Sequence, residues 1–219
     1  MNAPVLYSFR RCPYAMRARM ALSISQSPVR LREILLKDKP EEMVAASQKA
    51  TVPVLQLEDG TVIDESLAVM RWALERDDPE GWLVPNADHH DDMLALVAEN
   101  DGSFKHHLDR YKYSARYDAA EKLLHRDAGE VFLRKLNDRL AGSPFLFGEK
   151  RSFADVAIFP FVRQFRVADE QWFDTQNFEP LQEWLKGLMS SPLFEGVMKK
   201  YAPWKETGQE ISFPEMLTA

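Results

Sequence analysis

Cysteine is almost missing from this sequence, because Cys12 is the only one among 219 residues. A lone thiol cannot form an intramolecular disulfide, which excludes a disulfide-stapled secreted fold. It also excludes a metal site built from several cysteines. Any redox chemistry at Cys12 therefore needs a second sulfur that another molecule brings.

Long apolar runs and an excess of positive charge are missing as well. No stretch approaches the roughly 18 consecutive apolar residues of a membrane-spanning helix, so we expect no membrane partner. The first ten residues lack a charged segment followed by a long apolar one, so we expect no secretory signal and a cytoplasmic location. The net charge of -6 makes nucleic acid a poor partner. With 45% hydrophobic residues, the chain can still build a core.

The first 78 residues alternate between strand and helix patterns. Short β-type runs are separated by segments with apolar residues at helical spacing, and Glu58-Asp59-Gly60-Thr61 is a hairpin signal. A β-α-β unit favours a parallel pair, and the hairpin adds an antiparallel edge. The order β-α-β-α-β-β-α therefore predicts an α/β domain over residues 1–78. Its expected elements are strands at 5–9, 29–36, 51–57 and 62–63, and helices at 14–25, at 40–47 and from Ser66 onward.

The rest of the chain carries helical patterns only. Residues 79–87 contain Pro79, Gly81 and Pro85, so we interpret them as a linker. The helical patterns over residues 88–219 predict an all-α domain. Ser152 and Asp155 have the spacing of a capping box at a helix start. The expected helices lie at 88–113, after Ser152, at 180–189, at 192–201, and at 118–140 with Leu124, Ala128, Phe132, Leu136 and Leu140 at four-residue steps.

Cys12 stands where the first strand passes into the first helix. Pro13 suits the first position of a helix, because its missing N–H costs nothing there. The helix N-terminus and the adjacent Arg10 and Arg11 favour a thiolate, which can act as a nucleophile near neutral pH. The alternative is a small buried side chain.

Two further places in the first domain suggest peptide binding. Pro53 belongs at a strand end, and the Val52–Pro53 bond is a candidate for a cis peptide. This arrangement leaves Val52 free to pair with an extended peptide, although an ordinary edge strand is the alternative. Ser66 is a natural N-cap, and a helix N-terminus with Glu65 beside it could bind an amino-acid zwitterion. The alternative is an acid placed there only because the helix dipole favours it.

Taken together, these features resemble the thioredoxin-like fold, and with the helical domain they resemble the glutathione transferase superfamily. The likeness is strongest to the cysteine-type group of omega-like and glutaredoxin-like members. It covers about residues 4–200. The residues that carry it are Cys12-Pro13-Tyr14-Ala15, Lys37-Asp38-Lys39-Pro40-Glu41, Val52-Pro53-Val54-Leu55, Glu65-Ser66 and Ser152-Phe153-Ala154-Asp155.

The resemblance implies a role for each residue at these positions. Cys12 would be the nucleophile that forms a mixed disulfide with glutathione. Ala15 stands where the dithiol members have a second cysteine, so the chemistry would be monothiol. Tyr7 lies in the first strand and is expected in the core rather than at the site. The glutathione-binding residues would be Tyr14 packing on the tripeptide, Lys39 at the glycyl carboxylate, Val52 with Pro53 at the cysteinyl backbone, and Glu65 and Ser66 at the γ-glutamyl ammonium and carboxylate.

The implied function is glutathione-dependent thiol transfer, namely deglutathionylation, with dehydroascorbate reduction and weak conjugation as further activities. Glutathione would be a cosubstrate, and we expect no bound organic cofactor and no metal. The run of Asp and His at residues 88–92 points around a helix in different directions and does not form one ligand set. The other partners implied are a small hydrophobic or disulfide substrate and a second copy of the chain in a homodimer. The alternatives are a non-catalytic binding module and a glutathionyl-hydroquinone reductase.

The acceptor site is expected where the first domain faces the long helices of the second. Candidates by position and polarity are Phe104, His107, Tyr111 and Tyr117. Ordinary helix packing is the alternative for each of them.

Overall fold

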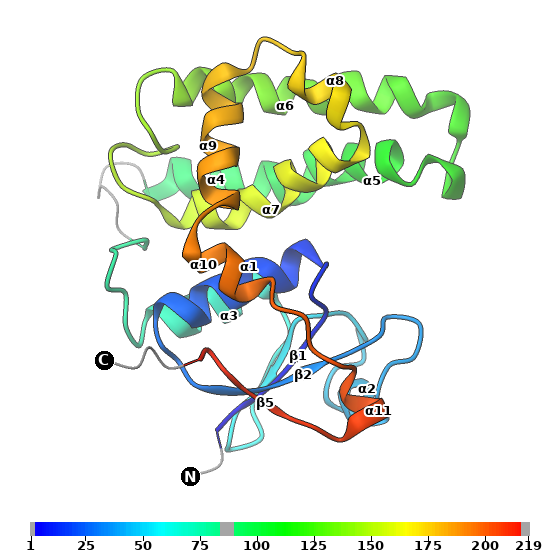
Figure 1. The fold of residues 1–219 in the computed structure, drawn as a ribbon, viewed down its shortest axis with the longest axis vertical. Helices are drawn as coiled ribbons and strands as arrows, with labels where there is room; N and C mark the ends of the chain where they lie inside the picture. The colour runs from blue at the N-terminus through cyan, green and yellow to red at the C-terminus, as the bar shows by residue number, and fades with distance from the viewer. Residues whose placement is uncertain (1–2, 84–89, 216–219) are drawn as a thin grey trace. The chain divides into compact units, whose positions relative to one another are not determined.

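The computed structural model describes residues 3–83 and 90–215 of the chain (Figure 1). Its contacts divide it into two compact units, one formed by Met1–Pro79 with Ser191–Ala219 and the other by Glu80–Ser190. Part of the predicted linker, residues 84–87, lies outside the described residues. The helical domain predicted over 88–219 is too long, because the chain from Ser191 onward belongs to the first unit.

The first unit is built on a five-stranded sheet with the order β4-β3-β1-β2-β5. Strands β1 and β2 are parallel, and all other neighbours are antiparallel. This arrangement confirms the β-α-β-α-β-β-α order expected for the first 78 residues. The strands are β1 (Val5–Ser8), β2 (Val29–Glu33), β3 (Val54–Gln56), β4 (Val62–Ile63) and β5 (Ile211–Phe213).

Strand β5 corrects the expectation that the chain beyond residue 88 is only helical. It pairs with β2 so that Phe213 faces Val29 and Ile211 faces Leu31. Three residues are too few to show an alternating pattern, and such a segment becomes a strand through the pairing that the sheet edge offers. The pairing also covers an edge that β2 would otherwise expose.

Among the described residues, the first unit has five helices. Helix α1 packs against both α3 and α10 (Figure 1). It begins with the predicted Pro13 at its first position and is buried over most of its length. The helices are α1 (Pro13–Ile24), α2 (Glu41–Ala46), α3 (Ser66–Leu74), α10 (Pro192–Val197) and α11 (Trp204–Thr207).

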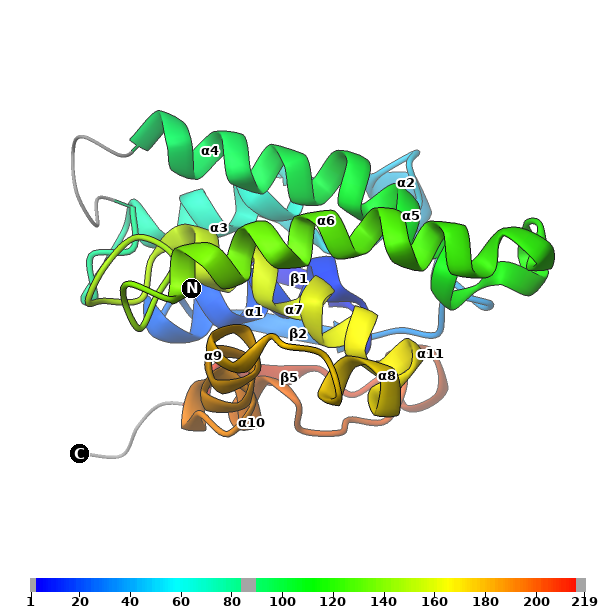
Figure 2. The same cartoon turned by 90° about the horizontal axis from the view of Figure 1, so that it is seen from above.

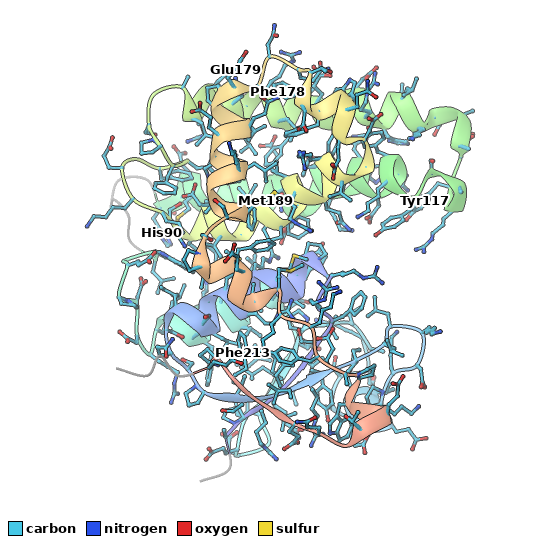
Figure 3. All side chains as sticks on the ribbon, viewed as in Figure 1. His90, Tyr117, Phe178, Glu179, Met189 and Phe213 are labelled. Atoms are coloured by element: carbon cyan, nitrogen blue, oxygen red, sulfur yellow. The ribbon has the colours of Figure 1, made fainter. Side chains whose placement is uncertain are left out.

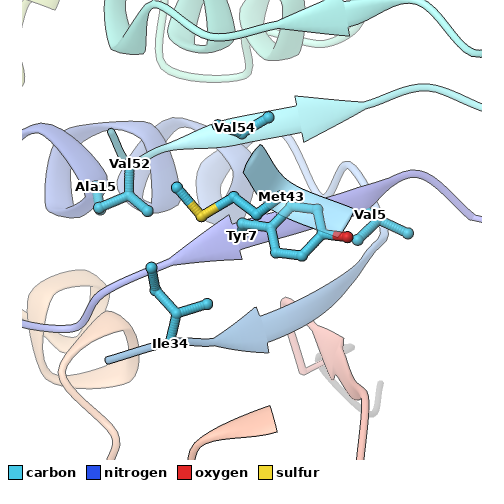
Figure 4. Close-up of a cluster of buried hydrophobic side chains, with 7 residues drawn as sticks. All are labelled: Val5, Tyr7, Ala15, Ile34, Met43, Val52 and Val54. Atoms are coloured by element: carbon cyan, nitrogen blue, oxygen red, sulfur yellow. The ribbon is translucent and has the colours of Figure 1, made fainter. Parts of the chain in front are cut away.

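One apolar cluster of this unit ends at Cys12. Figure 4 shows its seven buried side chains, which come from β1, β3 and the segments around them, including one residue of α1 and one of α2. Cys12 packs against the cluster from its rim and is only half-buried. The packing therefore fixes the position of Cys12 without sealing it in. The cluster consists of Val5, Tyr7, Ala15, Ile34, Met43, Val52 and Val54.

The second unit contains α4 to α9. Helix α6 runs back along α5, and α7 packs against α4 and α5 (Figure 2). A π-helical turn at Asn100–Phe104 interrupts the helix expected over 88–113. No helix among the described residues is long and apolar enough to cross a membrane. The helices are α4 (His90–Glu99), α5 (Lys105–Lys112), α6 (Lys122–Leu140), α7 (Phe153–Ala168), α8 (Glu170–Asp174) and α9 (Glu179–Met189).

Helix α7 starts at the predicted capping box. The Ser152 hydroxyl accepts a hydrogen bond from the Asp155 N–H, and the Asp155 carboxylate accepts one from the Ser152 N–H. Asp155 is fully buried and also accepts from the Leu146 N–H and from the Trp184 indole. Burial raises the pKa of Asp155, and these donors oppose the rise.

The inward face of α6 differs from the predicted one. Leu124 has an exposed fraction of 63%, whereas His125 is buried. With 3.6 residues per turn, each four-residue step advances about 40°, so Leu124 and Leu140 lie about 160° apart around the axis. A four-residue pattern therefore cannot stay on one face over this length. The buried positions are His125, Gly129, Phe132, Leu133, Leu136 and Leu140.

Candidate active site

Cys12 is the N-cap residue of α1. Its backbone is extended, its N–H donates to the Phe9 carbonyl at 3.0 Å, and its carbonyl accepts the first helical bond from Met16 at 2.9 Å. The Sγ atom lies 3.6 Å from the Val52 carbonyl oxygen, close enough for a weak thiol hydrogen bond. The first N–H groups of a helix have no partner within it, and they favour a negative charge at this position.

A buried ion pair lies on the side of α1 that also carries Cys12. Arg19 is 0% exposed and Glu33 is 7% exposed, and their charged groups are 3.8 Å apart. Arg19 donates to the Arg10 carbonyl at 2.8 Å, while Glu33 accepts from the Arg10 N–H at 2.7 Å. The pair therefore holds the backbone of Arg10, two residues before the thiol.

The charge of Arg19 is coupled to Cys12. Burial lowers the pKa of Arg19 to about 10, and a negative charge on Glu33, or on Cys12 when it is ionised, acts in the opposite direction. Arg19 is thus still protonated at neutral pH. Because a charge interaction is mutual, this buried cation stabilises a thiolate at Cys12. Burial also raises the pKa of Glu33.

Sequence reasoning placed the helpful cations at Arg10 and Arg11 and missed Arg19. Arg11 is exposed, and its guanidinium lies over the Phe9 ring, 5.4 Å from the centroid. The available signal was the spacing: Arg19 follows Cys12 by seven residues, which is two helical turns on one face. Glu33 carried no such signal, because it comes from a strand.

Val52 and Pro53 lie just before β3, which is shorter than the strand predicted over 51–57, and the peptide bond between them is cis as predicted. Both side chains are buried. No described residue accepts a hydrogen bond from the Val52 N–H, while the Val52 carbonyl faces Cys12. The structure thus brings Cys12 and Val52 together and leaves the Val52 N–H available for an added strand.

The start of α3 differs from expectation at Ser66. Glu65 is the N-cap residue, and Ser66 is the first residue of the helix. The Ser66 hydroxyl is buried and accepts a hydrogen bond from Arg17 Nε at 3.0 Å, so it points toward α1 instead of capping α3. Arg17 is itself buried and lies over the Tyr14 ring, 5.0 Å from the centroid. Arg17, which sequence reasoning missed, therefore links two predicted site residues.

Glu65 already has a cationic partner. Lys49 Nζ lies 2.5 Å from a Glu65 carboxylate oxygen and 3.2 Å from Asp64. Asp64 also accepts from the Ser47 hydroxyl at 2.7 Å, and that bond followed by Lys49 lowers the pKa of Asp64. The carboxylate of Glu65 is largely exposed, so it is accessible to a second cation. Lys49 carried no motif that could have identified it.

Lys39 and Tyr7 occupy different surroundings. Lys39 is half-buried in the loop before α2, and none of the described carboxylates forms an ion pair with it. Tyr7 is 1% exposed, and its hydroxyl accepts from Arg32 at 2.7 Å, as expected for a core residue. Burial raises the pKa of Tyr7.

Two of the four candidates for the acceptor site are core residues of the second unit. Phe104 and Tyr111 are each 1% exposed, and their rings pack on Phe165 with centroid distances of 5.4 and 4.9 Å. They are too buried to line a substrate pocket, because the helix–helix interface takes their rings. Tyr117 is 51% exposed (Figure 3), and His107 is half-buried.

Comparison with protein families matches both units. The family model described as the N-terminal domain of glutathione S-transferase matches residues 6–81. The model described as the C-terminal domain of glutathione S-transferase matches residues 114–187. Together they account for most of the chain, and they agree with the resemblance that the motifs carried.

Individual proteins point the same way. The chain is 26% identical over 189 residues to mouse glutathione S-transferase omega-1, covering 86% of this chain and 77% of the relative. It is 33% identical over 67 residues to glutaredoxin 2 of Escherichia coli strain K12, covering 31% of each. A solved omega 3C glutathione transferase from Trametes versicolor superposes with a TM-score of 0.77 at 19% identity, covering 93% of this chain and 92% of that one. The last likeness concerns the fold, and it confirms a thioredoxin-like unit with a helical one.

Proposed function

Because the chain belongs to the glutathione transferase family, we propose that it is a glutathione-dependent thiol transferase in which Cys12 forms a mixed disulfide with glutathione. The observation that carries the proposal is the setting of Cys12. Its half-buried sulfur stands at the start of α1, 3.6 Å from the Val52 carbonyl, with the buried Arg19 cation coupled to it. The helix start and the Arg19 cation favour a thiolate, whereas the Val52 carbonyl accepts a hydrogen bond only from the protonated thiol. The half-buried position keeps Cys12 reachable.

The proposed reaction has two steps. The Cys12 thiolate attacks the glutathione sulfur of a mixed disulfide; that S–S bond breaks, and the electron pair leaves on the acceptor sulfur, which takes a proton. The thiolate of a second glutathione then attacks the same sulfur, releasing oxidised glutathione and restoring the Cys12 thiolate. In sum, one mixed disulfide and one glutathione are converted to one acceptor thiol and one oxidised glutathione. A stabilised Cys12 thiolate is both well populated and a better leaving group in the second step.

The glutathione-binding roles belong to the same proposal. Val52, before the cis bond to Pro53, would pair its backbone with the cysteinyl part of the tripeptide, and Tyr14 would pack on it. The γ-glutamyl carboxylate would bind at the start of α3 near Ser66, where nine helical residues supply a dipole. Glu65 would hold the ammonium group in competition with Lys49, and Lys39 would reach the glycyl carboxylate.

The decisive experiment compares wild-type protein with Cys12→Ala and Cys12→Ser. Each is incubated with oxidised glutathione and analysed by mass spectrometry, and then assayed with a glutathione mixed disulfide, dehydroascorbate and a glutathionyl-hydroquinone. We expect one glutathione adduct on wild-type protein, none on the variants, and loss of mixed-disulfide reduction in both. Unchanged reduction by Cys12→Ala would overturn the mechanism. Binding of glutathione by wild-type protein without turnover of any substrate would favour the non-catalytic module.

A matched lysine pair tests the binding mode. Lys39→Ala should raise KM for glutathione, whereas Lys37→Ala should not, because Lys37 is exposed and lies two residues away. Equal KM values for the two variants would remove Lys39 from the proposed site.

The homodimer is a separate proposal that sedimentation tests. Exposed Leu124 and Val131 lie seven residues apart on α6 and are apolar side chains that a partner would cover.

A further inference from the structure

Three histidines of the second unit converge where α5 packs on α6. His106 and His107 are consecutive residues of α5, and His125 lies in the first turn of α6. One ring nitrogen from each lies within 4.8 Å of those of the other two. All three belong to the unit that does not contain Cys12.

The spacing is close to that of a coordination site. His107 Nδ1 and His125 Nδ1 are 2.9 Å apart, and the three ring centroids are separated by 5.1, 5.2 and 5.8 Å. Nitrogens bound tetrahedrally at roughly 2.0–2.1 Å from a zinc ion are about 3.3 Å apart. The close pair therefore needs to open by a few tenths of an ångström, while His106, which is exposed, has to move inward.

The close pair of rings offers at least one nitrogen lone pair. At 2.9 Å the two Nδ1 atoms share one proton, so at least one of them is an acceptor. Burial, followed by neighbouring positive groups, lowers the pKa of His107 and of His106. Neutral imidazole is the form that binds a metal, so both shifts act in favour of binding.

Charged neighbours orient one ring and oppose another. His125 Nε2 lies 3.5 Å from the Glu121 carboxylate, one turn earlier, which leaves Nδ1 facing His107. A carboxylate behind a histidine is the usual outer partner of a metal ligand. Arg110 acts against binding, since its guanidinium lies 3.0 Å from His106 Nδ1. His106 would therefore coordinate through Nε2, and the Arg110 charge weakens the affinity.

We propose that His106, His107 and His125 form a binding site for a divalent transition metal, coordinated by three imidazole nitrogens and completed by solvent. Imidazole ligands suit Zn²⁺, Cu²⁺, Ni²⁺ and Co²⁺ rather than Mg²⁺ or Ca²⁺. The occupied site would tie the start of α6 to α5. Because the metal binds the folded chain, it would raise the stability of the second unit.

The test uses untagged full-length protein titrated with ZnCl₂ by calorimetry and with CoCl₂ by visible absorption. We expect one ion per chain and a Co²⁺ spectrum of nitrogen and oxygen ligands without a thiolate charge-transfer band. His106→Gln and His107→Gln should each weaken Zn²⁺ binding at least tenfold. His90→Gln is the matched control, because His90 is an exposed histidine on α4, and it should bind like wild-type protein.

Three results would overturn the proposal. One is the absence of saturable Zn²⁺ binding by wild-type protein. Another is wild-type affinity in both His106→Gln and His107→Gln, provided that circular dichroism shows both variants folded. The third is loss of binding in Cys12→Ser, which would place the metal at the thiol. His125 is left unchanged in the primary test because its buried side chain also packs the start of α6.

Discussion

The ion pair between Arg19 and Glu33 supports the sharpest prediction, because it separates a role in stability from a role at the thiol. Arg19→Met removes the cation and leaves the Glu33 carboxylate buried without a counter-charge. Uncompensated buried charges of this kind cost about 3–5 kcal/mol of the free energy of unfolding. Glu33→Gln should cost a similar amount, since it leaves Arg19 charged in the same interior with an exposed fraction of 0%. The double variant should recover most of the loss, because no buried charge remains.

The two single variants should differ in their effect on the ionisation of Cys12. Arg19→Met should move the midpoint of Cys12 alkylation by iodoacetamide to higher pH, since the thiolate loses a stabilising cation. Glu33→Gln should move it to lower pH or leave it in place, because the cation remains and its opposing charge is gone. Urea unfolding followed by circular dichroism gives the stabilities, and alkylation rates between pH 5 and 10 give the midpoints. The same midpoint in wild-type protein and in a folded Arg19→Met variant would refute the coupling.

Three further predictions concern the second unit. Asp155→Ala should cost about 3–5 kcal/mol in urea unfolding, because the Trp184 indole and two backbone N–H groups lose their buried acceptor; a loss below 1 kcal/mol would contradict this account. In Gly129→Ala, the added Cβ would lie 2.6 Å from Phe165, so overpacking should cost about 1–3 kcal/mol of the free energy of unfolding. The higher helix propensity of alanine should offset about 1 kcal/mol of that cost. A more stable variant would show that Phe165 moves freely. The pKa of His107 is lowered in the folded state, so the unfolded chain takes up a proton at His107 more readily than the folded chain. The stability that neutral His107 contributes is therefore complete above its ordinary pKa of about 6.5 and is lost as the pH falls through that value. His107→Gln should therefore reduce the loss of stability between pH 7.5 and 5.5, and an unchanged slope would argue against a shifted His107.

Features that depend on neighbouring residues in the sequence could be predicted well. The capping box of Ser152 and Asp155, the helix start at Pro13 and the cis bond before Pro53 all agree with the structure. Each is decided within a few residues by hydrogen bonding or by the geometry of proline. The position of Cys12 belongs to this group, because a strand, a turn and a proline fixed it locally.

Features that depend on distant segments could not be predicted. The hydroxyl of Ser66 was expected to cap its own helix, but Arg17 lies close enough to bind it. Glu33 lies in a predicted strand and no pattern singled it out, although its charge is matched by Arg19 of α1. In both cases the partner comes from an element brought near by folding, and no local pattern encodes which charge will be there. Resemblance to a family names the residues of a site but does not reveal such supporting pairs.

The placement of β5 has a consequence for how the protein is made. The first unit takes its sheet edge and α10 from the last stretch of the chain, where Glu210 also pairs with Arg30 and Arg32 of β2. A ribosome therefore releases the sequences of β1 to β4 long before the segment that finishes their sheet, and the whole of the second unit is synthesised in between. During that interval β2 has an open edge, which is the kind of surface that chaperones protect in unfinished chains.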